Sequence, residues 1–147
     1  MKTILNGLLI ALVVMLAGCA GSSLGDVREN NPLQSGTVHA ETAPLAECVR
    51  QGIERDSWRF GQPVAHSTQH TDPPSTSVYA MYSRSTLFEI AFHPVAPSST
   101  RVEYRRSYDG HGTQEQAWTI INNCASQLSA EAVPHTGTGR AIQVGGQ

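Results

Sequence analysis

Along the chain, the spacing of apolar residues changes from a helical repeat to strict alternation and back to a helical repeat. This pattern limits the possible folds more than any other feature of the sequence. The first helical repeat falls within about residues 44–56 and consists of Leu45, Cys48, Val49 and Ile53. We expect this helix to follow Thr42 or Ala43, with Pro44 in its first turn, where a missing amide donor is harmless. Trp58 and Phe60 come directly after it and are expected to anchor the core.

A second helix is predicted to begin at Thr113. Thr113 and Gln116 have the spacing of a capping box, in which each residue satisfies a backbone amide of the first turn. The apolar stripe that follows consists of Ala117, Trp118, Ile121, Cys124, Ala125 and Leu128. Such a stripe indicates a helix with one face against a core.

Between the two helices, apolar and polar residues alternate, which predicts β-strands. The apolar members are Val78, Ala80 and Tyr82, then Phe88, Ile90 and Phe92, then Val102 and Tyr104. A further strand is expected around residues 64–68, and a loop over 71–76. A sheet with one apolar face is typically antiparallel and needs a cover. The predicted fold class is therefore α+β: a two-layer sandwich of helix, three or four antiparallel strands and helix, with both helices on one sheet face.

The opposite face of this sheet is the candidate binding face. It would carry Glu89, His93, Arg101, Glu103 and Arg105, with Arg106 near the strand end. One interpretation is a solvated face on which opposite charges pair across strands. The other is a surface for an anionic partner, such as an envelope glycan or an acidic protein, because the forked donors of arginine match carboxylate and phosphate groups.

The N-terminal segment has the layout of a secretory signal peptide. Lys2 is followed by an apolar run from Ile4 to Leu16, and small residues precede Cys19. The run Leu16, Ala17, Gly18, Cys19 resembles the lipobox of bacterial lipoproteins. This resemblance implies cleavage before Cys19, a diacylglycerol on its sulfur and an acyl group on its new amino group. An uncleaved membrane helix is the alternative, but the run is shorter than the roughly 20 residues that span a bilayer.

The lipobox sets the expected domain organisation and location. Residues 1–18 are the predicted signal peptide, 19–42 a lipidated flexible tether rich in Gly, Ser and Asn, 43–133 the α+β domain, and 134–147 a loose tail in which Ala141, Ile142 and Val144 could add a short strand. Ala20 stands where lipoproteins of this kind that stay in the inner membrane often carry Asp. The resemblance therefore favours the outer membrane, with the domain facing the periplasm.

With Cys19 assigned to lipid, Cys48 and Cys124 remain. An even number of cysteines in a chain exported to an oxidising compartment predicts a disulfide. Each lies on the apolar face of a predicted helix, so two packed helices would bring them together. A catalytic thiol is the alternative, although neither cysteine has the surroundings of a known nucleophile motif.

Several residues invite an enzymatic interpretation. His66 and His70 are four residues apart, as helical metal ligands are, but they lie in an expected strand, where this spacing is too long for easy chelation. Asp109 and His111 could act as an acid–base pair in the turn before the second helix. We expect no metal and no cofactor other than the covalent lipid on Cys19.

Charge and composition limit the class of partner. The formal net charge is −2, without the basic excess that nucleic-acid binding domains show. Beyond the lipobox, the landmarks are Cys48, Trp58, the strand from Leu87 to His93, Tyr104 and Cys124. Their order resembles that of small lipoproteins of Gram-negative bacteria, a group without a settled activity. The sequence therefore favours a non-enzymatic lipoprotein that binds an envelope component in an accessory or structural role. An anchored inhibitor or immunity protein against an envelope-targeting toxin is one alternative, and a hydrolase or metal-dependent enzyme using His66, His70, His93, Asp109 and His111 is the other.

Overall fold

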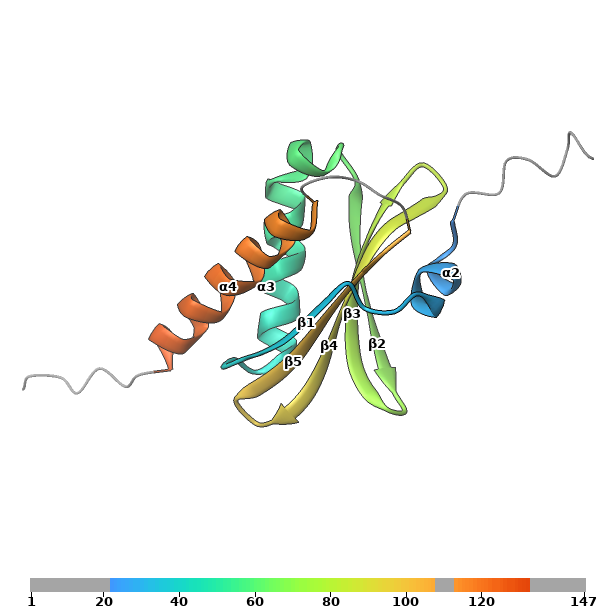
Figure 1. Ribbon diagram of the computed structural model, residues 1–147. Helices are drawn as coiled ribbons and strands as arrows, with labels where there is room; N and C mark the ends of the chain where they lie inside the picture. Colours follow the sequence, from blue (N-terminus) through green and yellow to red (C-terminus); the bar gives the residue numbers. More distant parts are fainter. Residues whose placement is uncertain (1–21, 108–112, 133–147) are drawn as a thin grey trace, which may run out of the picture.

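The computed structural model describes residues 22–107 and 113–132, which form one antiparallel sheet flanked by helices (Figure 1). The elements follow in the order α2 (Leu24–Glu29), β1 (Gln34–Val38), α3 (Thr42–Arg55), the 3₁₀ turn η1 (Ser57–Phe60), β2 (Val64–Thr71), β3 (Pro74–Tyr82), β4 (Ser85–Ala96), β5 (Ser99–Arg106) and α4 (Thr113–Glu131). The strand order is β1-β5-β4-β3-β2, with every neighbouring pair antiparallel. The predicted α+β class is confirmed, and the described part has five strands where three or four were predicted.

Helices α3 and α4 cover one face of the sheet, and α2 lies on the other (Figure 1). The face under α3 and α4 supplies the core. Its fully buried side chains include Val78, Ile90, Phe92, Val102 and Tyr104 from the strands, and Leu45, Val49, Ile53 and Ile121 from the helices. The two helical repeats and the strand alternation therefore meet in one layer of apolar side chains. Tyr82 departs from the alternation: the β3–β4 register shifts between Ala80 and Met81, and Tyr82 beyond the shift is 59% exposed.

The predicted flexible tether is wrong for the described residues from Ser22 onward. Helix α2 carries a capping box between Ser23 and Asp26, and it inserts the fully buried Val27 into the fold. Strand β1 pairs with β5 along its whole length. Gly36 of β1 allows close packing there, since a Cβ on it would stand 3.1 Å from the Trp118 ring of α4. The folded domain therefore begins at least twenty residues earlier than expected.

Smaller corrections concern the boundaries of elements. The expected loop over 71–76 is wrong, because β2 runs to Thr71 and β3 starts at Pro74, and only Asp72 and Pro73 connect them. Helix α3 begins at Thr42, so Thr42 and Ala43 belong to its first turn. Helix α4 begins at Thr113, whose hydroxyl accepts a hydrogen bond from the Tyr104 hydroxyl at 3.1 Å. The predicted capping box is wrong, because the Gln116 Oε1 is buried without a hydrogen-bond partner among the described residues and so accepts no backbone amide there.

The core prediction for the residues after α3 holds only in part. Phe60 is 4% exposed and packs against Phe88, with ring centroids 5.5 Å apart. Trp58 is 67% exposed, and the Arg59 guanidinium lies 4.9 Å from the centre of its ring. The tight 3₁₀ turn allows only one of the two aromatic side chains to face inward.

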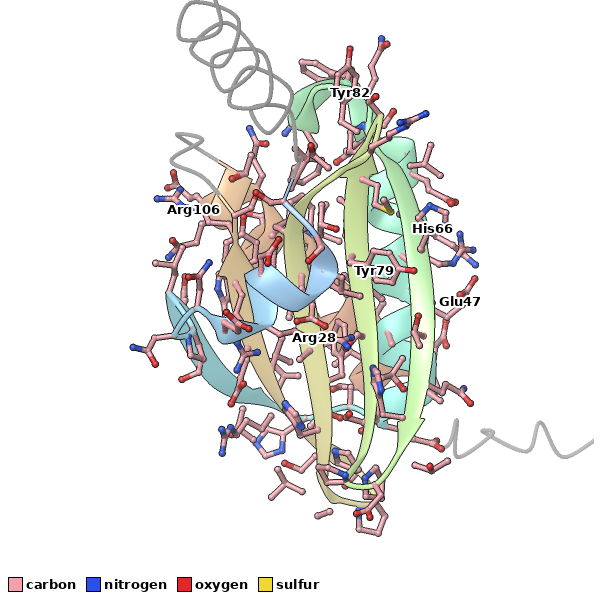
Figure 2. The ribbon with its side chains drawn as sticks, turned by 90° about the vertical axis from the view of Figure 1, so that its right-hand side faces the viewer. Arg28, Glu47, His66, Tyr79, Tyr82 and Arg106 are labelled. Atoms are coloured by element: carbon pink, nitrogen blue, oxygen red, sulfur yellow. A yellow bond between two sulfur atoms is a disulfide. The ribbon has the colours of Figure 1, made fainter. Side chains whose placement is uncertain are left out.

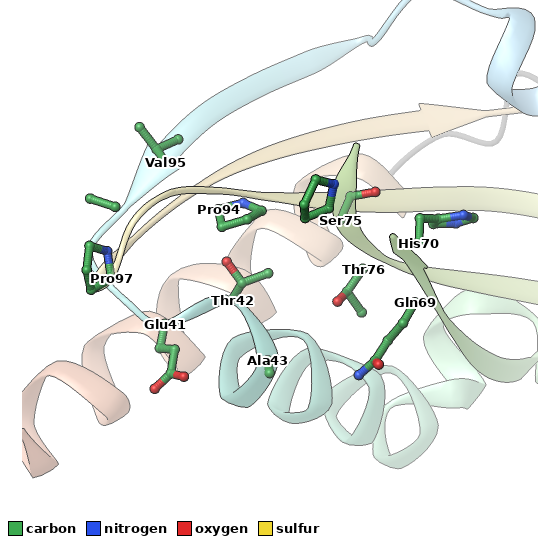
Figure 3. Close-up of a pocket in the computed structure, with 12 residues that line it drawn as sticks. Glu41, Thr42, Ala43, Gln69, His70, Ser75, Thr76, Pro94, Val95 and Pro97 are labelled. Atoms are coloured by element: carbon green, nitrogen blue, oxygen red, sulfur yellow. The ribbon is translucent and has the colours of Figure 1, made fainter. Parts of the chain in front are cut away.

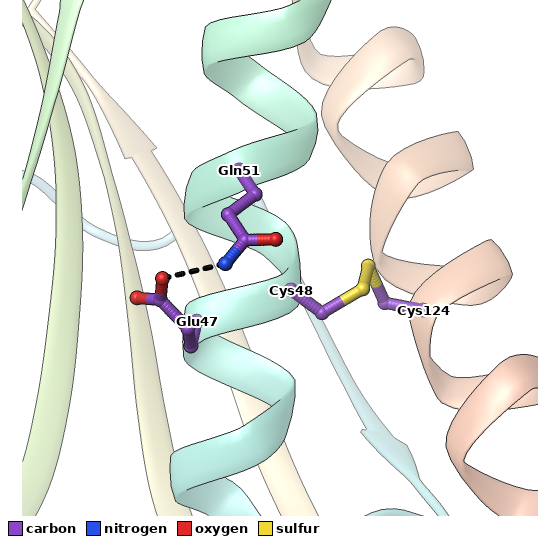
Figure 4. The surroundings of a disulfide bond; sticks show 4 residues. All are labelled: Glu47, Cys48, Gln51 and Cys124. Atoms are coloured by element: carbon purple, nitrogen blue, oxygen red, sulfur yellow. Dashed lines mark hydrogen bonds between the residues drawn. A yellow bond between two sulfur atoms is a disulfide. The ribbon is translucent and has the colours of Figure 1, made fainter. Parts of the chain in front are cut away.

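A disulfide joins the two core helices, as predicted (Figure 4). Cys48 of α3 and Cys124 of α4 have an S–S distance of 2.06 Å and close a sequence separation of 76 residues. One turn away, Gln51 donates a hydrogen bond to Glu47 at 2.8 Å on the exposed side of α3. Arg50 also donates to Glu47, and these contacts lower the pKa of Glu47 to about 2. The predicted signal peptide, Cys19, and the residues of the expected C-terminal strand lie outside the described residues.

Candidate binding face on the outer side of the sheet

Helix α2 places one arginine over the sheet face opposite α3 and α4, which we call the outer face (Figure 2). The Arg28 Nε donates to the Glu89 carboxylate of β4 at 2.8 Å. One terminal nitrogen of Arg28 also lies 3.1 Å from His70 Nε2 and 3.4 Å from the Ser77 hydroxyl. Glu89 is 1% exposed, so Arg28 neutralises a buried carboxylate that the sheet alone would leave uncompensated.

A second buried carboxylate, Glu103, lies on β5. Arg101 and Arg105 stand two residues before and after it on the same strand face, and each donates to one oxygen of Glu103. Glu103 is 4% exposed. Burial raises the pKa of Glu103, but the hydrogen bonds from Arg101 and Arg105 outweigh burial and hold its pKa below the usual value. Glu103 therefore keeps its negative charge in the folded protein at neutral pH.

A hollow of about 270 Å³ opens on the outer face beside these pairs. It is lined by Arg28, His70, Asp72, Pro73, Ser75, Ser77, Glu89, Ala91, His93 and Arg105. The His93 Nε2 lies 3.7 Å from a Glu103 oxygen, beyond hydrogen-bonding distance. The hollow thus combines two guanidinium groups, two imidazoles and two acidic side chains, an arrangement that can hydrogen-bond a small polar or anionic group.

The structure brings the five residues of the predicted binding face together on the outer face. Glu89 pairs in register with Arg105, and His93 with Arg101, while Glu103 lies between the two arginines. Arg106 is the exception: it pairs with Phe88 of the core face and lines a cavity with Phe60 and Tyr82. Alternation along β5 explains this correction, because consecutive residues of a strand point to opposite faces.

Charge pairing on this face differs from the expected cross-strand pattern. Glu103 is paired along its own strand, and Glu89 is paired with Arg28, 61 residues away in sequence. Sequence reasoning did not identify Arg28, because its segment was assigned to the tether. The only local signal was the capping box of Ser23 and Asp26, which marks a helix start.

Of the residues proposed for enzymatic chemistry, His66, His70 and His93 share the outer face but do not form one site. His70 and His93 line the hollow, whereas His66 stacks on Tyr79 with ring centroids 5.4 Å apart. Asp109 and His111 lie outside the described residues. Within residues 22–107 and 113–132, no group of three or more His, Cys, Asp or Glu side chains is arranged to hold a metal ion.

A larger groove of about 480 Å³ lies at the end of the sheet near the β4–β5 turn (Figure 3). The start of α3, the end of β2, the start of β3 and the Pro94–Pro97 segment line it, and His70 contributes to both this groove and the hollow. Val95 beside it is 63% exposed. This groove is more apolar than the outer face and has no ion pair among its described lining residues.

No family model and no curated protein matches the chain. No helix in the described part is both long and apolar enough to cross a membrane.

Proposed function

We propose that this chain is a lipid-anchored lipoprotein of the outer membrane whose periplasm-facing domain binds an envelope component through the outer face. The lipobox at Leu16–Cys19 supports the anchor. The Cys48–Cys124 pair supports export, because structural disulfides persist in oxidising compartments. The role is accessory or structural, without catalysis by the chain itself.

The hollow on the outer face is the observation that carries the binding proposal. Glu89 and Glu103 are buried, and they accept hydrogen bonds from Arg28 and Arg105. Arg101 is different, since its side chain is 58% exposed and only one of its terminal nitrogens donates to Glu103 among the described contacts. Arg101 does not line the hollow but pairs in register with His93, which does, so its remaining donors face solvent beside the hollow, where they fit a carboxylate or phosphate of the partner.

Crosslinking in intact cells tests this proposal. The lipidated, tagged chain carries a photoreactive amino acid in place of Ser75, which lines the hollow, because the mature chain has no lysine for amine-directed crosslinkers. The species captured on illumination are identified for the otherwise wild-type chain, Arg101→Ser and Arg50→Ser. Arg50 is the matched control, because it makes exposed ion pairs with Glu47 and Glu54 on α3. We expect one dominant envelope component, with a yield about tenfold lower for Arg101→Ser, as loss of a hydrogen bond to a charged group predicts.

Two results would overturn the proposal. One is recovery of abundant outer-membrane proteins alone, without a dominant species. The other is equal recovery from wild type and Arg101→Ser, which would remove the outer face as the binding surface. An unmodified Cys19 in the purified chain would remove the anchor.

A further inference from the structure

One end of the domain gathers most of the exposed large apolar side chains. We call it the hairpin end and define it by Trp58 and Arg59 of η1, Val64 at the start of β2, and Tyr82 and Arg84 at the β3–β4 turn. Trp58, Val64 and Tyr82 are 67%, 60% and 59% exposed, and Leu33 and Val95 are the other exposed large hydrophobics in the described residues. Phe60, Gly61 and Tyr82 line one cavity, so η1 and the turn are neighbours. Figure 2 shows Tyr82 at this end.

The described chain also begins at the hairpin end. The Thr86 amide donates to the Ser22 carbonyl at 2.8 Å, which fixes the start of the domain to the beginning of β4. Cys19 precedes Ser22 by three residues, a stretch that spans at most about 11 Å. By contrast, β4 runs from Ser85 to Ala96, so its far end lies roughly 36 Å away at 3.3 Å per residue. A lipid on Cys19 can therefore bring only this end of the domain to the membrane.

The side chains of the hairpin end suit a phospholipid surface. Trp and Tyr rings favour the headgroup level of a bilayer, where one edge is apolar and the other wet. Arg59 stacks over Trp58 at 4.9 Å, and Arg84 is exposed on the turn. Of the nearby acidic groups, Asp56 lies 3.7 Å from Arg55, and Glu115 lines a cavity with Arg59. Residues 58–64 and 82–84 themselves contain two arginines, Arg59 and Arg84, and no acidic residue, which favours anionic headgroups.

We propose that the hairpin end lies against the surface of an anionic phospholipid membrane, with Trp58 and Tyr82 at the headgroup level. This contact rests on the lipid anchor proposed above. It fixes the orientation of the domain, because the groove near the β4–β5 turn then faces away from the membrane. The outer face stands roughly upright, open to a partner in the periplasm.

Intrinsic fluorescence tests this contact, because the chain contains two tryptophans. The mature lipidated chain is reconstituted in vesicles of phosphatidylethanolamine and phosphatidylglycerol, with or without lipids brominated near the headgroup end of the acyl chains. Trp118→Phe leaves Trp58 as reporter, and Trp58→Phe leaves Trp118, whose half-buried ring packs against Gly36 of the edge strand β1. We expect brominated lipid to quench Trp58 emission by about half and to leave Trp118 emission unchanged.

A charge-reversal variant tests whether the hairpin end prefers anionic headgroups. Arg84→Glu should reduce the quenching of Trp58, and Arg50→Glu, on the exposed side of α3, should not. Equal quenching in both variants would overturn the anionic preference.

Mass measurement of Cys19 and cosedimentation with vesicles separate the two proposals. A chain that is acylated and cosediments but shows no quenching of Trp58 overturns the membrane contact and leaves the anchor standing. A chain that lacks the lipid and does not cosediment overturns both. Quenching of Trp58 alone in an acylated chain supports both.

Discussion

Two carboxylates on the outer face are buried. The arginines that neutralise their negative charges are close in sequence for one carboxylate and far away for the other. Glu103 is held by Arg101 and Arg105, two residues away on its own strand. Glu89 depends on Arg28 of α2. Removing one member of a buried pair is costly, because the other charge stays in a poorly solvated site. The outer face is therefore part of the folded structure as well as a candidate surface for binding.

Glu103→Gln should lower the free energy of unfolding by about 2 kcal/mol at pH 7, since two arginines lose their charged acceptor. The folded pKa of Glu103 lies below its usual value of 4.5. Its stabilising effect is thus present above about pH 4.5 and is lost as the pH falls through the folded pKa. Urea denaturation between pH 7 and 3 should show wild type and Glu103→Gln converging at low pH.

Glu54→Gln is the control for this series. Its ion pair with Arg50 is exposed, so its loss should change stability by less than about 0.5 kcal/mol. A constant difference between wild type and Glu103→Gln down to pH 3 would show that Glu103 does not carry the acid sensitivity.

At the scale of elements, α3 and α4 pack more closely than two helices with ordinary side chains would allow. A Cβ on Gly52 of α3 would stand 2.5 Å from the Ile120 Cγ2 of α4. The disulfide between Cys48 and Cys124 joins the same two helices one turn away. The glycine and the disulfide together fix the separation of the helix layer, and with it the position of η1 at the end of α3.

Gly52→Ala should therefore destabilise the protein by about 1 kcal/mol, because overpacking costs about 1–3 kcal/mol and exceeds the helix propensity gained by alanine. In an Ile120→Ala background the clash is absent, so the same substitution should become stabilising by about 0.8 kcal/mol. Urea denaturation of the four variants of this cycle measures the coupling.

Gly25→Ala is the matched control on α2, where a Cβ finds only the Ser23 hydroxyl oxygen at 3.4 Å. It should not destabilise the protein. Additive effects of Gly52→Ala and Ile120→Ala would contradict the close packing of the two helices.

The elements that the sequence predicted are those in which a regular repeat of apolar residues continues over several turns or along a whole strand. Helices α3 and α4 and the central strands each place several apolar residues on one face, so the pattern reveals them. Helix α2 has six residues and one fully buried side chain, Val27, and β1 is a polar edge strand with Gly36 at its centre. The sequence pattern of α2 and of β1 is too short to predict either element, because tertiary contacts stabilise both.

At the scale of the whole molecule, the sequence predicted which residues share the outer face but not how that face is built. Alternation places Glu89, Arg101, Glu103 and Arg105 on one side. Alternation does not predict that the Glu89 carboxylate is buried, because its partner Arg28 comes from α2. The sequence pattern could not predict the hairpin end either. Only the path of η1 and the β3–β4 turn brings together Trp58, Val64 and Tyr82.

The orientation of the molecule follows from a short connection, and lengthening it provides the last prediction. A spacer of twenty Gly and Ser residues between Gly21 and Ser22 would behave as a flexible coil and let the domain turn freely at the membrane. Contact at the hairpin end would then depend on its own affinity alone, at a lower effective concentration. We expect the quenching of Trp58 by brominated lipid to fall at least twofold, while acylation of Cys19 and cosedimentation stay unchanged. A spacer of the same length inserted after Glu131, beyond the end of α4, should leave the quenching as it is. Full quenching with the spacer before Ser22 would show that the affinity of the hairpin end, rather than the short connection, sets the orientation.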